Sequence, residues 1–207
     1  MQQVRSLMDI TNTIAIYGRS GHGKVLADIA KAKGFTEILW IDDDPKKEAL
    51  SFLEFYEFYH EVPVLLGFGD NPTRQRMYNS LKSKGFSLPA IVHPSAIVSE
   101  SAELMDASVV MPNVVINADA KIALGCIINT NAVIEHDCII EDFVHISPSV
   151  SLAGNVKVSK FTHIGIGANV IQGICIGENV RVGSGAVVVK DLESNVTAVG
   201  VPAKVIS

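Results

Sequence analysis

Three histidines in the second half of the chain have the neighbours or spacing that acid–base chemistry or ligand binding requires. His136 lies between Glu135 and Asp137. A carboxylate beside an imidazole orients the ring and raises its basicity, so this arrangement favours a general base. His145 and His163 occupy equivalent positions in a sequence repeat that is described below. The alternative for each histidine is a solvated surface residue, and the elements around them decide between the two interpretations.

A glycine-rich loop near the N-terminus is a second candidate site. Residues 18–23 (GRSGHG) follow an apolar stretch and precede a segment with helical patterning. Backbone N–H groups at such a helix start bind phosphate, and Asp42 and Asp43 lie about 20 residues further on, where a carboxylate takes ribose or sugar hydroxyls. The Gly-x-x-Gly-x-Gly spacing differs from the dinucleotide pattern, and a purely structural turn is the alternative.

The elements that position this loop form a predicted α/β domain over residues 13–90, after a lead segment of residues 1–12. The expected strands are 13–17, 37–41, 62–67 and 88–92, and the expected helices are 24–33 and 72–84, whereas 46–61 lack a clear pattern. Alternating strands and helices imply a parallel sheet with crossover helices. The segment has room for roughly one mononucleotide-binding half, so a nucleotide-sugar fits better than NAD.

Residues 91–207, which carry the histidines, repeat with a period of six. Every sixth residue from Ala96 to Ala198 is small or apolar, and every sixth residue from Val98 to Val188 is a branched aliphatic. Two inward residues per short strand followed by a corner define a hexapeptide parallel β-helix, whereas a β-sandwich has no reason to keep this register. Residues that tolerate φ > 0 recur at the corners: Asn113, Asp119, Gly125, Asn131, Asp137, Asn155, Gly167, Gly173, Asn179 and Gly185.

The repeat assigns a place to each histidine. Three hexads make one triangular coil, so the segment supplies about five to six coils spaced ~4.8 Å apart. His145 and His163 fall at outward positions three hexads apart, which is one coil, so we expect them to stack on one outer face. His136 falls at a corner.

Composition narrows the function classes. The net charge is −5 and the pI is about 5.6, without a run of Lys or Arg, which argues against nucleic-acid or anionic-membrane partners. Cys126 and Cys138 fall at inward positions and Cys175 at an outward one, without CxxC pairing. No apolar run reaches the ~20 residues of a membrane span and no signal-peptide pattern opens the chain, so we expect a cytoplasmic protein.

Seven short segments together resemble the PglD/NeuD family of bacterial sugar acyltransferases, which are of the left-handed β-helix type. They are residues 17–23 (YGRSGHG), 41–43 (IDD), 111–117 (MPNVVIN), 129–130 (NT), 133–137 (VIEHD), 153–155 (AGN) and 200–204 (GVPAK). The resemblance is strongest to the branch that N-acetylates UDP-linked 4-amino sugars. It implies an α/β Rossmann-like domain followed by a left-handed parallel β-helix, acting as a homotrimer.

The resemblance also implies roles for residues. His136 would be the catalytic base, oriented by Asp137, which replaces the glutamate typical of the branch. The residues implied for acetyl-CoA are His145, Gly154 and Ile166, and those implied for the uridine nucleotide are Ser20, Gly21, His22, Asp42, Asp43 and Gly69. No metal is implied. Arg19 stands where small residues are common, close to the expected phosphate.

The expected reaction is direct transfer of acetyl from acetyl-CoA to the 4-amino group of a UDP-linked 4-amino-4,6-dideoxy sugar. O-acetylation of sialic acid is the first alternative. Others are a γ-type carbonic anhydrase with zinc on His136, His145 and His163, and a non-catalytic protein that binds nucleotide-sugars. The outward Cys175 leaves a covalent acyl intermediate open.

Overall fold

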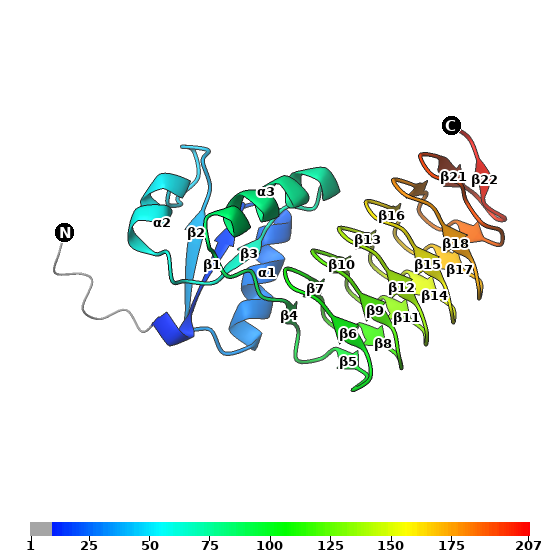
Figure 1. Cartoon of the computed structure of the whole chain (residues 1–207), viewed down its shortest axis with the longest axis horizontal. Coiled ribbons are helices and arrows are strands. Elements are labelled where there is room, and N and C mark those ends of the chain that lie inside the picture. The colour runs from blue at the N-terminus through cyan, green and yellow to red at the C-terminus, as the bar shows by residue number, and fades with distance from the viewer. Residues whose placement is uncertain (1–9) are drawn as a thin grey trace.

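The computed structural model describes residues 10–207 and contains an α/β part and a β-helix that lie side by side (Figure 1). Residues 1–9 of the predicted lead segment lie outside the described residues. The last three residues of that segment form a short 3₁₀ helix, η2 (Ile10–Asn12). The β-helix runs away from the α/β part, with the C-terminus at its far end.

The α/β part is a three-stranded parallel sheet in the order β2-β1-β3. Its elements are β1 (Thr13–Tyr17), α1 (Gly21–Ala32), β2 (Glu37–Ile41), α2 (Phe52–Phe58), β3 (Val64–Leu66) and α3 (Asn71–Ser83). The alternation predicted from the sequence is therefore present. The unpredicted helix is α2, which begins at a capping box formed by Ser51 and Glu54.

One predicted strand belongs elsewhere. Only Ile91–Val92 of the expected strand 88–92 is a strand, β4, and it pairs with β7 (Val109–Val110) of the β-helix. The residues before it bridge the two parts, because the carbonyl of Ser87 accepts from Val64 N and the carbonyl of Leu88 accepts from Ala107 N. The expected strand is therefore an edge contact of the α/β part followed by the first rung of the β-helix.

The β-helix has three faces, each a ladder of two-residue parallel strands. Face 1 contains β4, β7, β10 (Ile127–Ile128), β13 (His145–Ile146), β16 (His163–Ile164), β19 (Arg181–Val182), β21 (Thr197–Val199) and the antiparallel β22 (Lys204–Val205). Face 2 contains β5 (Ile97–Val98), β8 (Val115–Ile116), β11 (Val133–Ile134), β14 (Ser151–Leu152), β17 (Asn169–Val170) and β20 (Val187–Val188). Face 3 contains β6 (Glu103–Leu104), β9 (Lys121–Ile122), β12 (Ile139–Ile140), β15 (Lys157–Val158) and β18 (Cys175–Ile176). The partners in each ladder are three hexads apart in most rungs, as the repeat predicts.

The predicted inward positions form the core, and all ten predicted corner residues have positive φ. The inward residue just before each strand and the inward residue within it are fully buried through the middle coils, as with Val144 and Ile146. Some corners with positive φ hold residues that the sequence did not mark. Phe143 and Phe161 are such residues, and their rings stack at 6.1 Å. Tyr78 of α3 meets Phe143 at 5.7 Å, so these aromatic corners support the α/β part.

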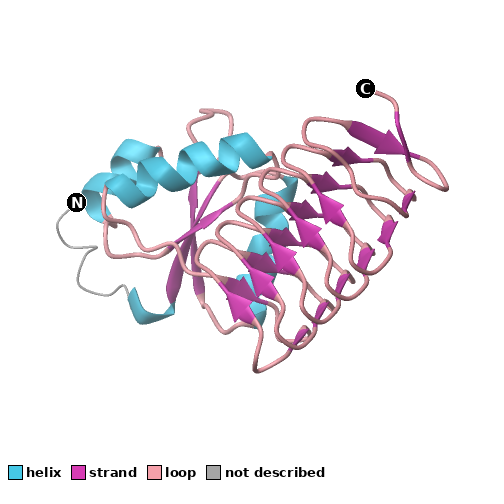
Figure 2. Cartoon of the chain, turned by 45° about the vertical axis from the view of Figure 1, so that its right-hand side comes forward, coloured by secondary structure: helices cyan, strands magenta, loops and turns pink. Residues whose placement is uncertain are grey.

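The two parts share one hydrophobic core. Leu26 of α1 belongs to the same buried cluster as Ile91 and Val109 on face 1. In Figure 2, the helices lie against the loops and strands at the near end of the β-helix. The glycine loop is consequently held against face 1, where His145 and His163 lie.

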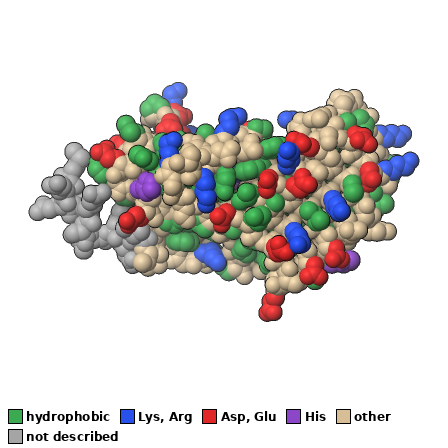
Figure 3. Space-filling model, viewed as in Figure 1, with side chains coloured by type: hydrophobic (Ala, Val, Ile, Leu, Met, Phe, Trp, Pro, Cys, Tyr) green, Lys and Arg blue, Asp and Glu red, His purple; other side chains and the backbone are tan. Residues whose placement is uncertain are grey.

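Two surface properties bear on partners. Acidic and basic side chains are interspersed over the face drawn in Figure 3, without a large patch of one sign on that face. Within residues 10–207, none of the helices has the length and apolar character that crossing a membrane requires.

Ile146→Ala should lower the free energy of unfolding by about 2–5 kcal/mol, because it opens a cavity in a fully buried layer. Denaturant or thermal unfolding measures the change. The control is Lys157→Ala on an exposed strand position, which should stay within about 0.5 kcal/mol of wild type. Equal effects of the two substitutions would contradict the assignment of inward and outward positions.

Candidate active site

His136 and Asp137 form an exposed pair at the corner between β11 and β12. Nδ1 of His136 lies 2.7 Å from Oδ2 of Asp137, and this hydrogen bond raises the pKa of His136. Because Asp137 accepts at Nδ1, the proton of the neutral ring is on Nδ1 and Nε2 carries the lone pair. The shorter aspartate therefore reaches the imidazole, which is the geometry of an oriented base.

Gly154 lies one coil after His136 and leaves room for its ring. A Cβ at position 154 would stand 2.6 Å from Nε2 and Cε1 of His136, closer than atoms of this kind approach. Among residues 10–207, the N–H of Gly154 donates to no backbone carbonyl, while its carbonyl accepts from Gly173 N at 3.0 Å. A free N–H and the Nε2 lone pair thus lie at the same corner.

His145 is a largely buried imidazole on face 1. Its ring stacks on that of His163 with centroids 4.5 Å apart and planes 4° from parallel, as their one-coil spacing predicts. Burial, followed by the neighbouring His163 and Arg74, lowers the pKa of His145 to about 3. The ring is therefore neutral at physiological pH.

The tautomer of His145 follows from its neighbour Asn129. Oδ1 of Asn129 accepts from Thr130 N at 2.8 Å, which leaves the amide nitrogen facing Nε2 of His145 at 3.2 Å. Nε2 therefore accepts and Nδ1 carries the proton. Nδ1 is buried and makes no hydrogen bond within normal limits, but the backbone of Gly69 lies close enough to this ring to raise its pKa slightly against the larger effect of burial.

A single chain does not bring His136 and His145 together. His136 lies where faces 2 and 3 meet, which is the corner opposite face 1 in a triangular coil. His145 and His163 point outward from face 1. The three histidines of the carbonic anhydrase alternative are therefore not gathered within the chain, and no cluster of three His, Cys, Asp or Glu residues suited to a metal ion occurs among the described residues.

The glycine loop has the geometry of a phosphate-binding turn. Ser20 caps α1, accepting from Gly23 N at 3.4 Å and donating to the carbonyl of Gly67 at 2.9 Å. Gly21 begins the helix, and its Cβ position is open. A Cβ at Gly23 would collide with the carbonyl of Gly18, so that position requires glycine.

His22, within this loop, is half-buried. Burial, with a smaller contribution from the charge of Arg74, lowers its pKa to about 4. Its Nε2 is buried and has no hydrogen-bond partner in the structure. His22, like His145, is thus a neutral imidazole with an unsatisfied nitrogen, and it lies close enough to His145 to contribute to lowering the pKa of that ring.

The acidic pair after β2 is engaged with the chain itself. Asp42 accepts from Arg19 N at 2.8 Å, from Asp44 N at 3.1 Å and from Lys47 Nζ at 2.7 Å. These hydrogen bonds help keep the carboxyl ionised and its pKa low, against the opposing effect of burial. Asp42 therefore holds the glycine loop in shape, a role that the sequence did not indicate.

Asp43 and Arg19 are also engaged. Asp43 accepts from the Tyr17 hydroxyl at 2.6 Å and from Phe52 N at 3.0 Å. The guanidinium of Arg19 lies 5.6 Å from the ring centroid of Trp40 and donates to the carbonyl of Glu48. Arg19 thus binds the segment after β2 rather than reaching freely toward a phosphate.

Gly69 connects the two sites. Its carbonyl accepts from Arg74 Nη1 at 3.1 Å, and its backbone also approaches His145 closely enough to affect its pKa. Arg74 was not predicted as a site residue. Its position two helical turns before the buried Leu81 places it on the inner face of α3, which is the signal that the sequence contains.

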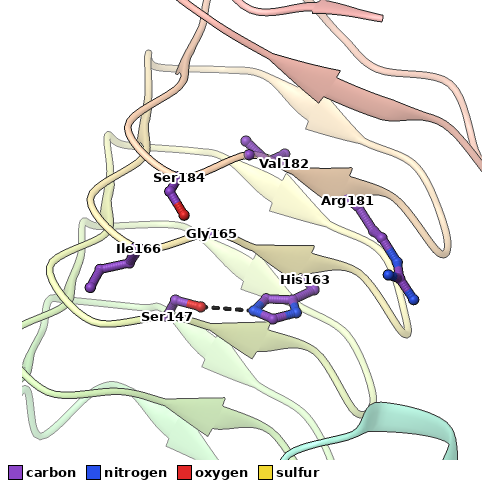
Figure 4. A pocket seen from close by; sticks show the side chains of 8 residues that line it. Ser147, His163, Gly165, Ile166, Arg181, Val182 and Ser184 are labelled. Carbon is purple, nitrogen blue, oxygen red and sulfur yellow. Dashed lines mark hydrogen bonds between the residues drawn. The ribbon is translucent and has the colours of Figure 1, made fainter. Parts of the chain in front are cut away.

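A pocket of about 320 Å³ lies on face 1 beyond His145 (Figure 4). Ile166, predicted to bind the cofactor, lines it and is 53% exposed. Nε2 of His163 and the Ser147 hydroxyl form a hydrogen bond of 2.8 Å. Ser184 and Arg181 also line the pocket. Burial, followed by the charges of Arg181 and Arg74, lowers the pKa of His163. The sequence did not mark Ser147, Arg181 and Ser184, because small and polar outward residues are common in such coils.

An α/β domain with a phosphate-type loop, joined to a parallel β-helix with an oriented corner histidine, is the architecture of a β-helix sugar acyltransferase. Residues 13–81 match the model of the PglD N-terminal domain. The chain is similar to the acetyltransferase domain of PglB from Neisseria gonorrhoeae, with 34% identity, a TM-score of 0.88 and coverage of 94% of this chain and 100% of that one.

Two further relatives agree. A GDP-perosamine N-acetyltransferase from Caulobacter crescentus, solved with CoA and GDP-perosamine, is 38% identical, with a TM-score of 0.89 over 94% of this chain and 97% of that one. The UDP-N-acetylbacillosamine N-acetyltransferase of Bacillus subtilis is 38% identical over 107 residues, 46% of this chain and only half the length of that protein. The chain belongs to the PglD family of sugar acyltransferases, so the family resemblance seen in the sequence is confirmed.

Asp137→Asn should lower the pKa of His136, because the carboxylate that stabilises the imidazolium is removed. The C2 proton of His136, followed by NMR against pH, measures the change. Glu135→Gln is the control, since Glu135 makes a smaller contribution and bonds the His136 backbone N–H. An unchanged midpoint in Asp137→Asn would contradict the pairing.

Proposed function

We propose that the chain is an acetyl-CoA-dependent N-acetyltransferase that acts on the 4-amino group of a UDP-linked 4-amino-4,6-dideoxy sugar. The His136–Asp137 pair beside Gly154 carries the proposal, because it offers a base and a free backbone N–H at one exposed corner. The two solved relatives, similar over nearly the whole chain, are named as an acetyltransferase domain and an amino-sugar N-acetyltransferase.

The proposed reaction is a direct transfer. Nε2 of His136 takes a proton from the sugar ammonium, and the amine then attacks the thioester carbonyl, forming the C–N bond. The oxyanion is stabilised by the N–H of Gly154. Collapse breaks the C–S bond, the CoA thiolate leaves with the proton that Nε2 of His136 holds, and the surplus proton of the new amide nitrogen passes to solvent. Asp137 keeps the Nδ1 proton in place and stabilises the imidazolium.

His145 is the proposed acetyl-CoA residue. Its neutral ring lies on the same face as the pocket lined by Ile166, which is proposed to hold the rest of the coenzyme. Because His136 lies opposite face 1, a complete site requires His136 of one subunit beside His145 of the partner subunit. This requirement supports the proposed homotrimer.

The nucleotide is proposed to bind at the glycine loop. Ser20, Gly21 and His22 lie at the start of α1, where a diphosphate would meet backbone N–H groups. Gly69 is two residues after Gly67, whose carbonyl accepts from the Ser20 hydroxyl. Asp42 and Asp43, at the end of β2, are also proposed to belong to the nucleotide site. Their hydrogen bonds with Arg19 N and the Tyr17 hydroxyl hold the adjoining segments in place.

Thiol release from acetyl-CoA tests the proposal, with a UDP-4-amino-4,6-dideoxy-N-acetylhexosamine, a GDP-4-amino-4,6-dideoxyhexose and sialic acid in parallel. Turnover with the UDP sugar is expected. Turnover with the GDP sugar alone would replace the nucleotide in the proposal, and turnover with sialic acid alone would replace N-acetylation by O-acetylation. No turnover with any acceptor would overturn the proposed activity.

His136→Ala should lower kcat by about 10²–10⁴-fold, because the general base is lost. The oligomer should persist, since the side chain is exposed. Cys175→Ala is the control, because Cys175 is an exposed thiol on face 3 and should be dispensable in a direct transfer. A burst of acyl-enzyme, or inactivity of Cys175→Ala, would instead indicate a covalent intermediate.

His145→Ala should raise KM for acetyl-CoA by about tenfold, corresponding to the loss of one hydrogen bond of roughly 1.4 kcal/mol. KM for the sugar nucleotide should change less. Steady-state kinetics with each substrate varied in turn separate the two. His93→Ala, which removes a half-buried histidine that makes a hydrogen bond with the Ser95 hydroxyl, is the matched control and should match wild type.

A further inference from the structure

Arg74 is a buried cation whose hydrogen bonds all go to uncharged oxygens. Its side chain is 1% exposed, and none of the ion pairs among residues 10–207 includes it. Burial lowers its pKa to about 10, so it stays charged at physiological pH. An unpaired buried charge costs several kcal/mol unless its donors are satisfied, so the arrangement of its acceptors is informative.

The acceptors come from two parts of the molecule. Nη1 donates to the carbonyls of Phe68 and Gly69 at 3.2 and 3.1 Å, in the loop that joins β3 to α3. Nε donates to the carbonyl of Gly125 at 2.7 Å, and Nη2 to that of Phe143 at 3.1 Å. Gly125 and Phe143 occupy the same corner in successive coils. One guanidinium therefore joins the loop to two coils.

Asn71 extends this attachment by one coil. Its Nδ2 donates to the carbonyls of Phe161 and Thr162 at 2.9 and 3.3 Å, and its Oδ1 accepts from Arg74 Nη2 at 2.8 Å. Phe161 is the next corner after Phe143. The start of α3 is thus fixed against three successive corners, and the loop with Gly69 is fixed to the same guanidinium.

The coil that Arg74 binds through Phe143 is the coil that carries His145, two residues further on. The backbone of Gly69 lies close enough to His145 to affect its pKa. Arg74 also acts electrostatically on His22, His145 and His163. The planar guanidinium is suited to this geometry because it donates in several fixed directions, whereas a lysine ammonium is a point charge on a flexible stem.

We propose that Arg74 is a positioning residue that sets the separation between the nucleotide-binding loop at Gly69 and the coil carrying His145. This inference rests on the proposed function. Because Arg74 touches neither proposed substrate, it acts through the backbone of both sites. Its loss lets the sugar nucleotide shift relative to the thioester while the coenzyme pocket on face 1 keeps its lining.

Arg74→Lys tests the inference. We expect kcat to fall by about 10–100-fold, as for a small misplacement of reacting groups, with KM for the sugar nucleotide raised and KM for acetyl-CoA within about twofold of wild type. The control is Lys82→Met, which removes another contact between α3 and the β-helix, the exposed 3.5 Å pair with Asp106. It should leave all three constants unchanged.

Asn71→Ala is the second variant. Its kinetics still test the inference if Arg74→Lys does not fold. It retains the guanidinium but removes one of its acceptors and the third corner contact, so we expect a smaller fall in kcat with the same KM pattern. All constants are measured well below the unfolding temperature of each variant. Wild-type kinetics in both Arg74→Lys and Asn71→Ala, or equal changes in both Michaelis constants, would overturn the inference.

The outcome for wild type separates this inference from the proposed function. Lack of turnover by wild type with every acceptor would overturn the proposed activity, and calorimetric binding of UDP would then decide the role of Arg74. Weaker UDP binding by Arg74→Lys than by Lys82→Met would support positioning of the loop. Equal affinities would overturn it.

Discussion

The coil of three hexads sets the spacings on which the site depends. Because each strand pairs with the strand one coil away, a side chain repeats on the same face at every coil. This constraint places His145 and His163 in a parallel stack and puts Gly154 beside His136. It also aligns the corner carbonyls of Gly125, Phe143 and Phe161 into a regular ladder of acceptors. The α/β part binds to that ladder.

The contact between the α/β part and the β-helix encloses two neutral imidazoles, those of His22 and His145, and the buried cation of Arg74. His22 and His145 lose their charge because the two parts of the chain enclose them, and Arg74 in the same enclosure adds to the effect. His136 lies outside it, exposed and paired with a carboxylate, and its pKa moves the other way. One chain therefore carries an exposed imidazole of raised pKa at one corner and a neutral imidazole pair on the opposite face. The proposed function assigns the two to a site shared between copies of the chain.

The sequence was sufficient to predict features that depend on residue type. Small and aliphatic side chains at fixed spacing predicted the inward layers, and Asn, Asp and Gly predicted ten corners. The pairing of His136 with Asp137 also follows from their adjacency. Arg74 could not be predicted to join the two sites, because its partners are mostly backbone carbonyls, which any residue supplies. Helix α2 was missed because its aromatic residues form no clear apolar stripe, and the engagement of Asp42 by Lys47 depends on the fold of an irregular segment.

Because α3 is attached to three successive corners, the junction depends on the number of residues between those corners. A change in chain length of a whole coil after Ser184 would leave the junction, the histidines and the pocket in place and alter only the distal end. One hexad gained or lost between Gly125 and Phe143 would instead rotate everything beyond by one face, moving His145 away from Gly69. The contacts of α3 with the three corners are therefore compatible only with a chain that keeps whole coils between them.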